Sequence, residues 1–239
     1  MVNWVNDFDK AQIIFQLGEK DEIEHRSIPA FETDYILADE LREELHQRMN
    51  IETISFHHLN SIRIEDDACV DIIIPYLWCF PHVGFAEQLI TQHFWRKGNH
   101  ACSDFLEAWT KHCIAAGMMG GTMETTLDNA FIHIQDKRKA LFYVDLMQAG
   151  YDFPFTMEML GRWRVPEALP IILDRIHDPT YLLLQNAVRA LAGYKNPQHL
   201  PLFRELLSES GVTQKAAAMA IRRIERKQAT EKCVTRAEE

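Results

Sequence analysis

VRALAGYKNPQHLPLFRELL, residues 188–207, contains the end of one helix, a turn of a few residues and the start of the next helix. Gly193 lies where the first helix should end. Asn196 can cap the following helix with its side-chain oxygen, and Pro197 suits the first helical position, where a missing N–H costs no hydrogen bond. A turn this short connects helices that lie antiparallel and side by side. The stretch therefore predicts an antiparallel helix pair.

This pattern recurs along the chain with a period near 30 residues. Residues 166–176 (PEALPIILDRI) align with residues 197–207 (PQHLPLFRELL), and Asp178-Pro179 repeats the pairing of a capping residue with proline. At a shift of 31 the matched pairs are Leu160 and Leu191, Trp163 and Tyr194, Pro166 and Pro197, Leu169 and Leu200, Ile172 and Phe203, and Ile176 and Leu207. At a shift of 30, Ala187 and Ala190 match Ala217 and Ala220. Such a period, built from two helices, is typical of a helical solenoid, in which each unit buries its apolar stripe against its neighbours.

These residues resemble HEAT-like repeats, and especially the short class named after the phycobilisome lyases. The resemblance covers about residues 155–227 and implies stacked helix pairs, whereas it implies no particular activity. Because Trp163 and Tyr194 hold the same repeat position, we interpret them as packing between repeats rather than as a cage for a ligand.

Helical periodicity continues upstream of this region. It predicts helices over residues 34–49, 68–79, 84–95, 103–116, 122–134 and 137–149, and thus five stacked pairs between residues 68 and 227. Alternating residues in 54–56 and 62–64 predict a small hairpin. We therefore expect an all-α protein with three parts. These are a divergent N-terminal segment over residues 1–65, an α-solenoid (α-α superhelix) of HEAT-like helical repeats over residues 66–227, and a polar, frayed tail over residues 228–239.

Composition predicts a soluble, cytoplasmic protein without a membrane partner. The most apolar run, residues 72–80, is much shorter than the roughly 20 residues of a membrane helix. The N-terminus lacks the basic start and apolar stretch of a secretory signal. Five cysteines are an odd number without close paired spacing, which is typical of reduced thiols.

The net charge of −10 is unevenly distributed along the chain. Residues 162–239 carry 13 Lys and Arg against 9 Asp and Glu, whereas residues 1–161 carry 12 Lys and Arg against 26 Asp and Glu. An acidic surface attracts basic partners and repels a phosphate backbone. We therefore expect the partner to be a basic protein, and we do not expect nucleic acid.

Histidine and cysteine are frequent in the middle of the chain, at His93, His100, Cys102, His112 and Cys113. A metal site requires ligands that converge, but adjacent residues such as the last two point about 100° apart on a helix. The iron-binding His-Glu dipeptides of deoxyhypusine hydroxylases, which are solenoid enzymes of similar build, do not occur here. We expect no metal and no cofactor. The alternative is a metal-dependent enzyme or lyase that uses His100, Cys102 and His112.

Polar residues on the second helices of the last two repeats form the predicted binding site. The predicted partner-binding residues are Gln185, Arg189, Lys215, Met219 and Arg222. Within each helix their spacings of three and four residues place them on one face. Second helices line the concave side of a solenoid, where such proteins bind partners.

Two of these predictions have a structural alternative. Arg189 is equally suited to pair with Asp178, which lies in the turn before its helix. Arg226 continues the spacing of the last helix, but there we favour a solvated surface on a terminal repeat.

The leading hypothesis is a non-catalytic protein-binding solenoid: a scaffold, an adaptor or an inhibitor. A specific version is an acidic immunity protein that neutralises a basic partner. The alternatives are the metal-dependent enzyme or lyase, and nucleic-acid binding through the basic C-terminal ridge. No small-molecule substrate is evident from the sequence.

Overall fold

The chain is described here by a computed structural model. It describes residues 32–51, 67–79, 84, 89–90, 100–178, 181, 183–209 and 211–237. This described part is helical and contains no strand, as expected for an all-α protein. The chain divides into two compact units, residues 1–119 and residues 120–239. The predicted hairpin and most of the predicted helix over residues 84–95 lie outside the described residues.

The first unit contains three described helices: α2 (Glu32–Met49), α4 (Asp67–Leu77) and α6 (His100–Ala115). Helix α2 buries Ala38, Leu41 and Leu45, whose spacing of three and four residues forms a single apolar stripe. It packs on α4, where the Tyr76 hydroxyl donates a hydrogen bond to the Glu44 carboxylate over 2.9 Å. Helices were predicted close to all three of these ranges, although α6 begins three residues earlier than expected.

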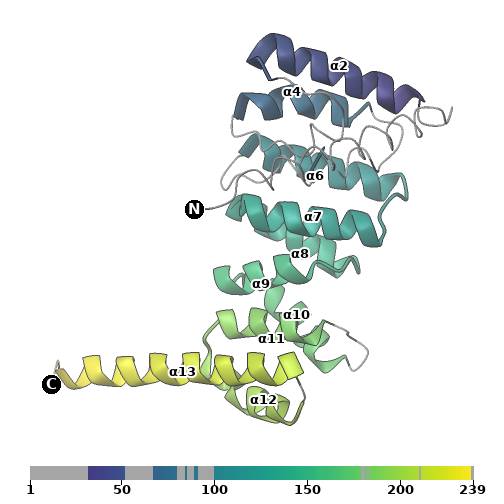
Figure 1. Ribbon diagram of the computed structural model, residues 1–239. Coiled ribbons are helices and arrows are strands. Elements are labelled where there is room, and N and C mark those ends of the chain that lie inside the picture. The colour runs from purple at the N-terminus through teal and green to yellow at the C-terminus, as the bar shows by residue number, and fades with distance from the viewer. Residues whose placement is uncertain are drawn as a thin grey trace, which may run out of the picture. The chain divides into compact units, whose positions relative to one another are not determined.

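The second unit begins with α7 (Gly121–Ile134) and continues as helix pairs (Figure 1). The pairs are η2 and α8 (Lys137–Lys139, Ala140–Gln148) with α9 (Pro154–Trp163), α10 (Ala168–His177) with α11 (Leu184–Gly193), and η3, α12 and η4 (Pro197–His199, Leu200–Glu205, Leu206–Ser208) with α13 (Gly211–Ala237). The second helices α9, α11 and α13 pack one on the next, with α7 on the far side of α9. Helix α10 packs on α8, α9 and α11, and α12 packs on α13. This unit is therefore an all-α stack of HEAT-like helix pairs.

The aligned repeat positions form the core of the second unit. Leu160 and Leu191 are fully buried, and so are Ile172 and Phe203. The last aligned position differs, because Leu207 is exposed and Leu206 is buried instead. At this point α12 tightens into the 3₁₀ turn η4, which has three residues per turn. The next buried residue is therefore Leu206, three residues after Phe203, and not Leu207, four residues after it.

Hydrogen bonds connect α7 to the start of α9, and α9 to α11, across 27 to 31 residues of sequence. Asp128 of α7 accepts hydrogen bonds from the backbone N–H groups of Phe155 (2.9 Å) and Thr156 (2.7 Å). These N–H groups are in the first turn of α9, so a carboxylate of α7, the helix packed beside α9, caps it. The Tyr194 hydroxyl donates to the Val165 carbonyl, which agrees with the inter-repeat role predicted for this tyrosine.

Three local predictions concerned the turns and the end of the chain. Asn196 caps the next helical turn as predicted, because its side chain accepts a hydrogen bond from the Gln198 N–H over 3.0 Å. Asp178 does not begin a helix: it is the residue at which α10 ends, and α11 begins only at Leu184. Residues 228–237, expected to fray, continue α13, and they contain neither Gly nor Pro to end the helix.

None of the described helices combines the length and the apolar character that crossing a bilayer requires.

Candidate partner-binding surface

Helices α9 and α11 approach each other closely enough for their backbones to touch. Gly161 of α9 meets the backbone of Ala190, and Gly193 of α11 meets the backbone of Gly161 and Arg162. A Cβ atom on Gly193 would lie 2.7 Å from the Arg162 nitrogen, closer than real Cβ atoms come to other atoms. This contact fixes the exposed side of α11 directly beside that of α9.

Glu158 connects the two exposed sides. Its carboxylate accepts hydrogen bonds from the Asn186 side-chain amide over 2.8 Å and from the Arg189 guanidinium over 3.3 Å. The structural alternative for Arg189 was an ion pair with Asp178. The structure pairs Arg189 instead with Glu158 of α9, the second helix of the repeat before. Because Arg189 keeps 46% of its side-chain surface exposed, its guanidinium also remains accessible to a partner.

The repeat register explains this pairing. A shift of 31 places Glu158 on Arg189, and a shift of 30 then places Arg189 on Met219. Equivalent positions of consecutive second helices are therefore neighbours in the stack. A second series in this register contains Arg162, Gly193 and Arg223.

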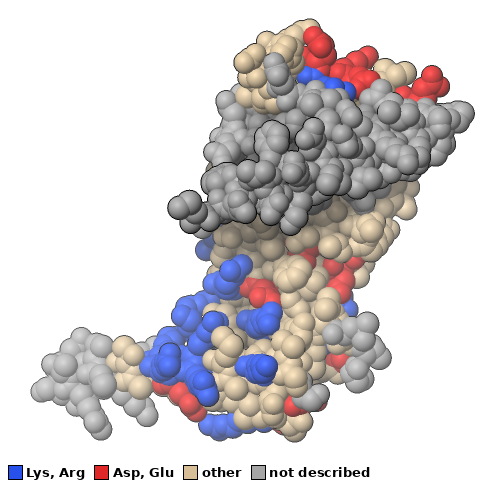
Figure 2. Space-filling model, viewed as in Figure 1, with Lys and Arg blue, Asp and Glu red and all other residues tan. Residues whose placement is uncertain are grey.

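Cations concentrate on the exposed side of these three helices, as Figure 2 shows over α9, α11 and α13. We call this surface the cationic face and define it by Arg162, Arg189, Lys215, Arg222, Arg223 and Arg226, all of which are exposed. Apart from Arg189, none of these six side chains has an ion-pair partner among the residues that the structure describes. The face therefore presents uncompensated positive charge, which attracts anionic groups.

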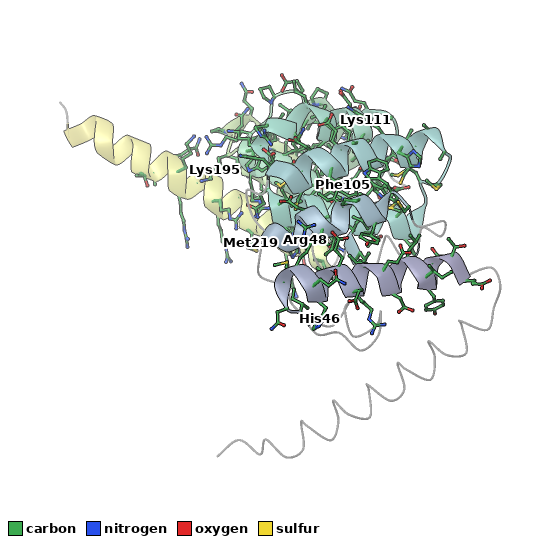
Figure 3. All side chains as sticks on the ribbon, turned by 90° about the horizontal axis from the view of Figure 1, so that it is seen from above. His46, Arg48, Phe105, Lys111, Lys195 and Met219 are labelled. Atoms are coloured by element: carbon green, nitrogen blue, oxygen red, sulfur yellow. The ribbon has the colours of Figure 1, made fainter. Side chains whose placement is uncertain are left out.

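Apolar side chains are interspersed with these charges. Met219 has an exposed fraction of 54%, and Phe155 of α9 has 44%. Figure 3 labels Met219 on α13. Lys215, Arg222 and Arg223 lie four residues before, three after and four after Met219, which makes them its neighbours on the helix surface. A flexible thioether side chain surrounded by cations can pack against an apolar residue of a partner.

The five predicted partner-binding residues lie on two helices that pack against each other. Gln185 and Arg189 are on α11, and Lys215, Met219 and Arg222 are on α13. Gln185 is half-buried, and the other four are exposed. Sequence reasoning did not select Arg162, Arg223 or the Glu158 that holds Arg189. The signal for them was the same repeat alignment, extended from apolar to charged positions.

The described histidine and cysteine residues of the middle region do not converge on one point. His100, Cys102 and His112 all lie on α6, and the two histidines are about 18 Å apart along its axis at 1.5 Å per residue. The His112 ring contacts those of Trp78 and Trp109 at centroid distances of 5.5 and 5.8 Å. Among the described residues there is no group of three His, Cys, Asp or Glu side chains that could hold a metal ion. His93 lies outside the described residues.

Comparison with protein families matches HEAT repeats over residues 156–232. This match covers α9 to α13 except for the ends, and it confirms the resemblance found in the sequence. The comparisons with curated proteins and with solved structures give no match. HEAT repeats are helical scaffolds of the kind that mediates protein interactions, and in this chain they carry the cationic face.

Proposed function

We propose that the chain is a non-catalytic scaffold that binds another protein on the cationic face. One observation carries this proposal: the residues predicted to bind a partner lie on α11 and α13, which pack together, and two of them, Lys215 and Arg222, have no ion-pair partner among the described residues. A protein surface that served only solubility would carry charges of both signs. Helices α9, α11 and α13 instead carry few acids beside their cations.

Binding would use a rigid surface. The backbone contact at Gly161 and Gly193 and the hydrogen bonds of Glu158 hold α9 and α11 in one arrangement before a partner arrives. A preformed surface loses little conformational entropy on binding. Arginine and exposed apolar side chains supply most of the energy in such interfaces, so Arg189 and Met219 are the expected centres of affinity.

An immunity-type inhibitor would bind a basic protein. Such a partner does not suit the cationic face, because like charges repel. It would suit the acidic part of the chain. Helix α2 exposes Glu32, Glu40 and Glu43, whereas Arg48 is its one exposed Lys or Arg. A basic protein released by Glu40→Lys with Glu43→Lys, but not by changes in the cationic face, would place the binding site for a basic partner on α2.

Site-specific photocrosslinking in the native cells tests the proposed function. A benzophenone amino acid at Gln185 lies one turn of α11 from Arg189 of the cationic face, whereas the same group at Leu141, 56% exposed on α8, lies on another layer. We expect one protein to be linked through position 185 and not through position 141. Arg189→Glu with Lys215→Glu should abolish that link.

The opposite pattern would contradict the proposal. A protein linked through position 141 but not through position 185 would show that another surface binds the partner. The same conclusion follows if the link at position 185 survives both charge reversals, because contact would then not depend on the cationic face.

A further inference from the structure

We propose that the segment bound on the cationic face is an acidic peptide whose carboxylates meet Arg162 and Arg223 and whose apolar side chain packs on Met219. This inference rests on the proposed function, because it names the chemistry of the partner at the same surface. Its first support is the charge of the face: of the six cations, only Arg189 has an ion-pair partner within the described part of the chain.

The second support is Met219, which favours an acidic peptide over the phosphate backbone of a nucleic acid. Its side chain is 54% exposed and has cations on both sides along the helix. A phosphate backbone offers no apolar group for a thioether, whereas a leucine or phenylalanine between acidic residues would remove Met219 from water. The surface therefore matches a peptide that alternates acidic and apolar residues.

The third support is Glu158, the acidic side chain beside Arg189. A nucleic acid has a charge on every nucleotide, so a strand along α9, α11 and α13 would place a phosphate close to this carboxylate. A peptide can place an uncharged residue there. Glu158 thus selects against a uniformly charged chain and favours one whose acids are spaced.

The register gives the spacing of those acids. Arg162 and Arg223 are equivalent positions of α9 and α13, with Gly193 of α11 between them. Packed helices lie about 8–10 Å apart, so the two helix axes are separated by about 16–20 Å. An extended chain advances about 3.3 Å per residue, so five or six residues cover this span.

Fluorescence anisotropy with defined probes tests the inference on the full-length protein. The first probe is a labelled peptide of about 12 residues with glutamates five or six positions apart and leucines between them, a length that exceeds the expected span. The second replaces each leucine with serine, and the third is an oligouridylate of similar length. We expect the leucine peptide to bind at least tenfold more tightly than the other two.

Three single variants locate the binding. Arg223→Glu should weaken the leucine peptide at least tenfold, whereas Lys137→Glu, the same charge reversal at an exposed position of η2, should change binding less than twofold. Met219→Ser should weaken the leucine peptide at least threefold and leave the serine peptide unchanged. Thermal melts of each variant show whether it is folded.

Other outcomes overturn the inference. Tighter binding of oligouridylate than of the leucine peptide would assign the face to nucleic acid. Equal effects of Arg223→Glu and Lys137→Glu would mean that the peptide binds elsewhere. If crosslinking at Gln185 captures a protein whose contacting segment is not acidic, this inference fails while the proposed function stands. If nothing is captured there, both fail.

Discussion

Gly161 of α9 lies so close to Ala190 of α11 that a Cβ atom on Gly161 would be 2.6 Å from the Ala190 carbonyl carbon. We expect Gly161→Ala to force the two helices apart, because backbone atoms cannot move aside as a flexible side chain can. Overpacking of this kind costs about 1–3 kcal/mol or more in the free energy of unfolding. Urea denaturation followed by circular dichroism measures the loss.

Gly121→Ala is the matched control for this change. Gly121 begins α7 and has no atom within 4 Å of the position of an added Cβ, so the free energy of unfolding should change by less than about 1 kcal/mol. Similar stability of the two variants would show that the contact between α9 and α11 is not tight.

The sequence predicted the repeat architecture because the repeat residues are local and regular. Leu160, Leu191 and Phe203 are buried where the alignment placed them. The alignment failed at Leu207, because the change from α-helix to 3₁₀ geometry depends on how α12 ends and not on the pattern of apolar residues.

The candidate site was predictable in part. The spacing within α11 and α13 identified the exposed residues, but pairing between helices requires the stacking register. For this reason the sequence suggested an ion pair between Arg189 and Asp178, which is near in sequence, whereas the actual partner of Arg189 is Glu158, one repeat earlier. The burial of Asp128 also has no sequence signal, because its partners are backbone N–H groups of another helix.

Leu191→Ala and Lys215→Ala compare the core of the repeats with the cationic face. Leu191 is fully buried, so its truncation should cost about 2–5 kcal/mol in the free energy of unfolding. Lys215 is exposed without an ion-pair partner among the described residues, so its loss should change stability by less than about 0.5 kcal/mol. Chemical denaturation of both variants checks this. Equal effects would mean that the buried side of these helices is misplaced.

Glu158→Gln tests the electrostatics of the cationic face. The change removes a negative charge beside Arg189 and should raise the affinity for the acidic leucine peptide about two- to fivefold, because an approaching carboxylate is no longer repelled. Stability should change by less than about 1 kcal/mol, since the ion pair is partly exposed. Anisotropy titrations at low and moderate salt measure the gain, which should shrink as salt is added.

Glu205→Gln serves as the control for that charge change. Glu205 is exposed at the end of α12, a helix that carries none of the six cations of the cationic face, so its neutralisation should raise the affinity less than Glu158→Gln does. An unchanged or reduced affinity after Glu158→Gln would show that this carboxylate does not oppose binding.

Asp128 should make the stability of the second unit depend on pH. Burial raises the pKa of Asp128 from 3.8 to about 6, against the hydrogen bonds from the N–H groups of Phe155 and Thr156, which lower it. The folded chain therefore holds this proton more tightly than the unfolded chain does. The resulting stabilisation is fully present below pH 3.8 and is lost as the pH rises through about 6.

Asp128→Asn removes this titration and isolates it from that of the other carboxylates. Urea denaturation at pH 4, 5, 6 and 7 should show wild type gaining stability relative to Asp128→Asn as the pH falls. The gain should reach about 3 kcal/mol at most, since one pKa unit corresponds to about 1.4 kcal/mol. Asp128→Ala should be less stable than Asp128→Asn by about 1 kcal/mol at every pH, because alanine cannot cap α9. A difference between wild type and Asp128→Asn that does not vary with pH would place the carboxylate in contact with water. If wild type instead loses stability relative to Asp128→Asn as the pH falls, the hydrogen bonds of the carboxylate outweigh its burial.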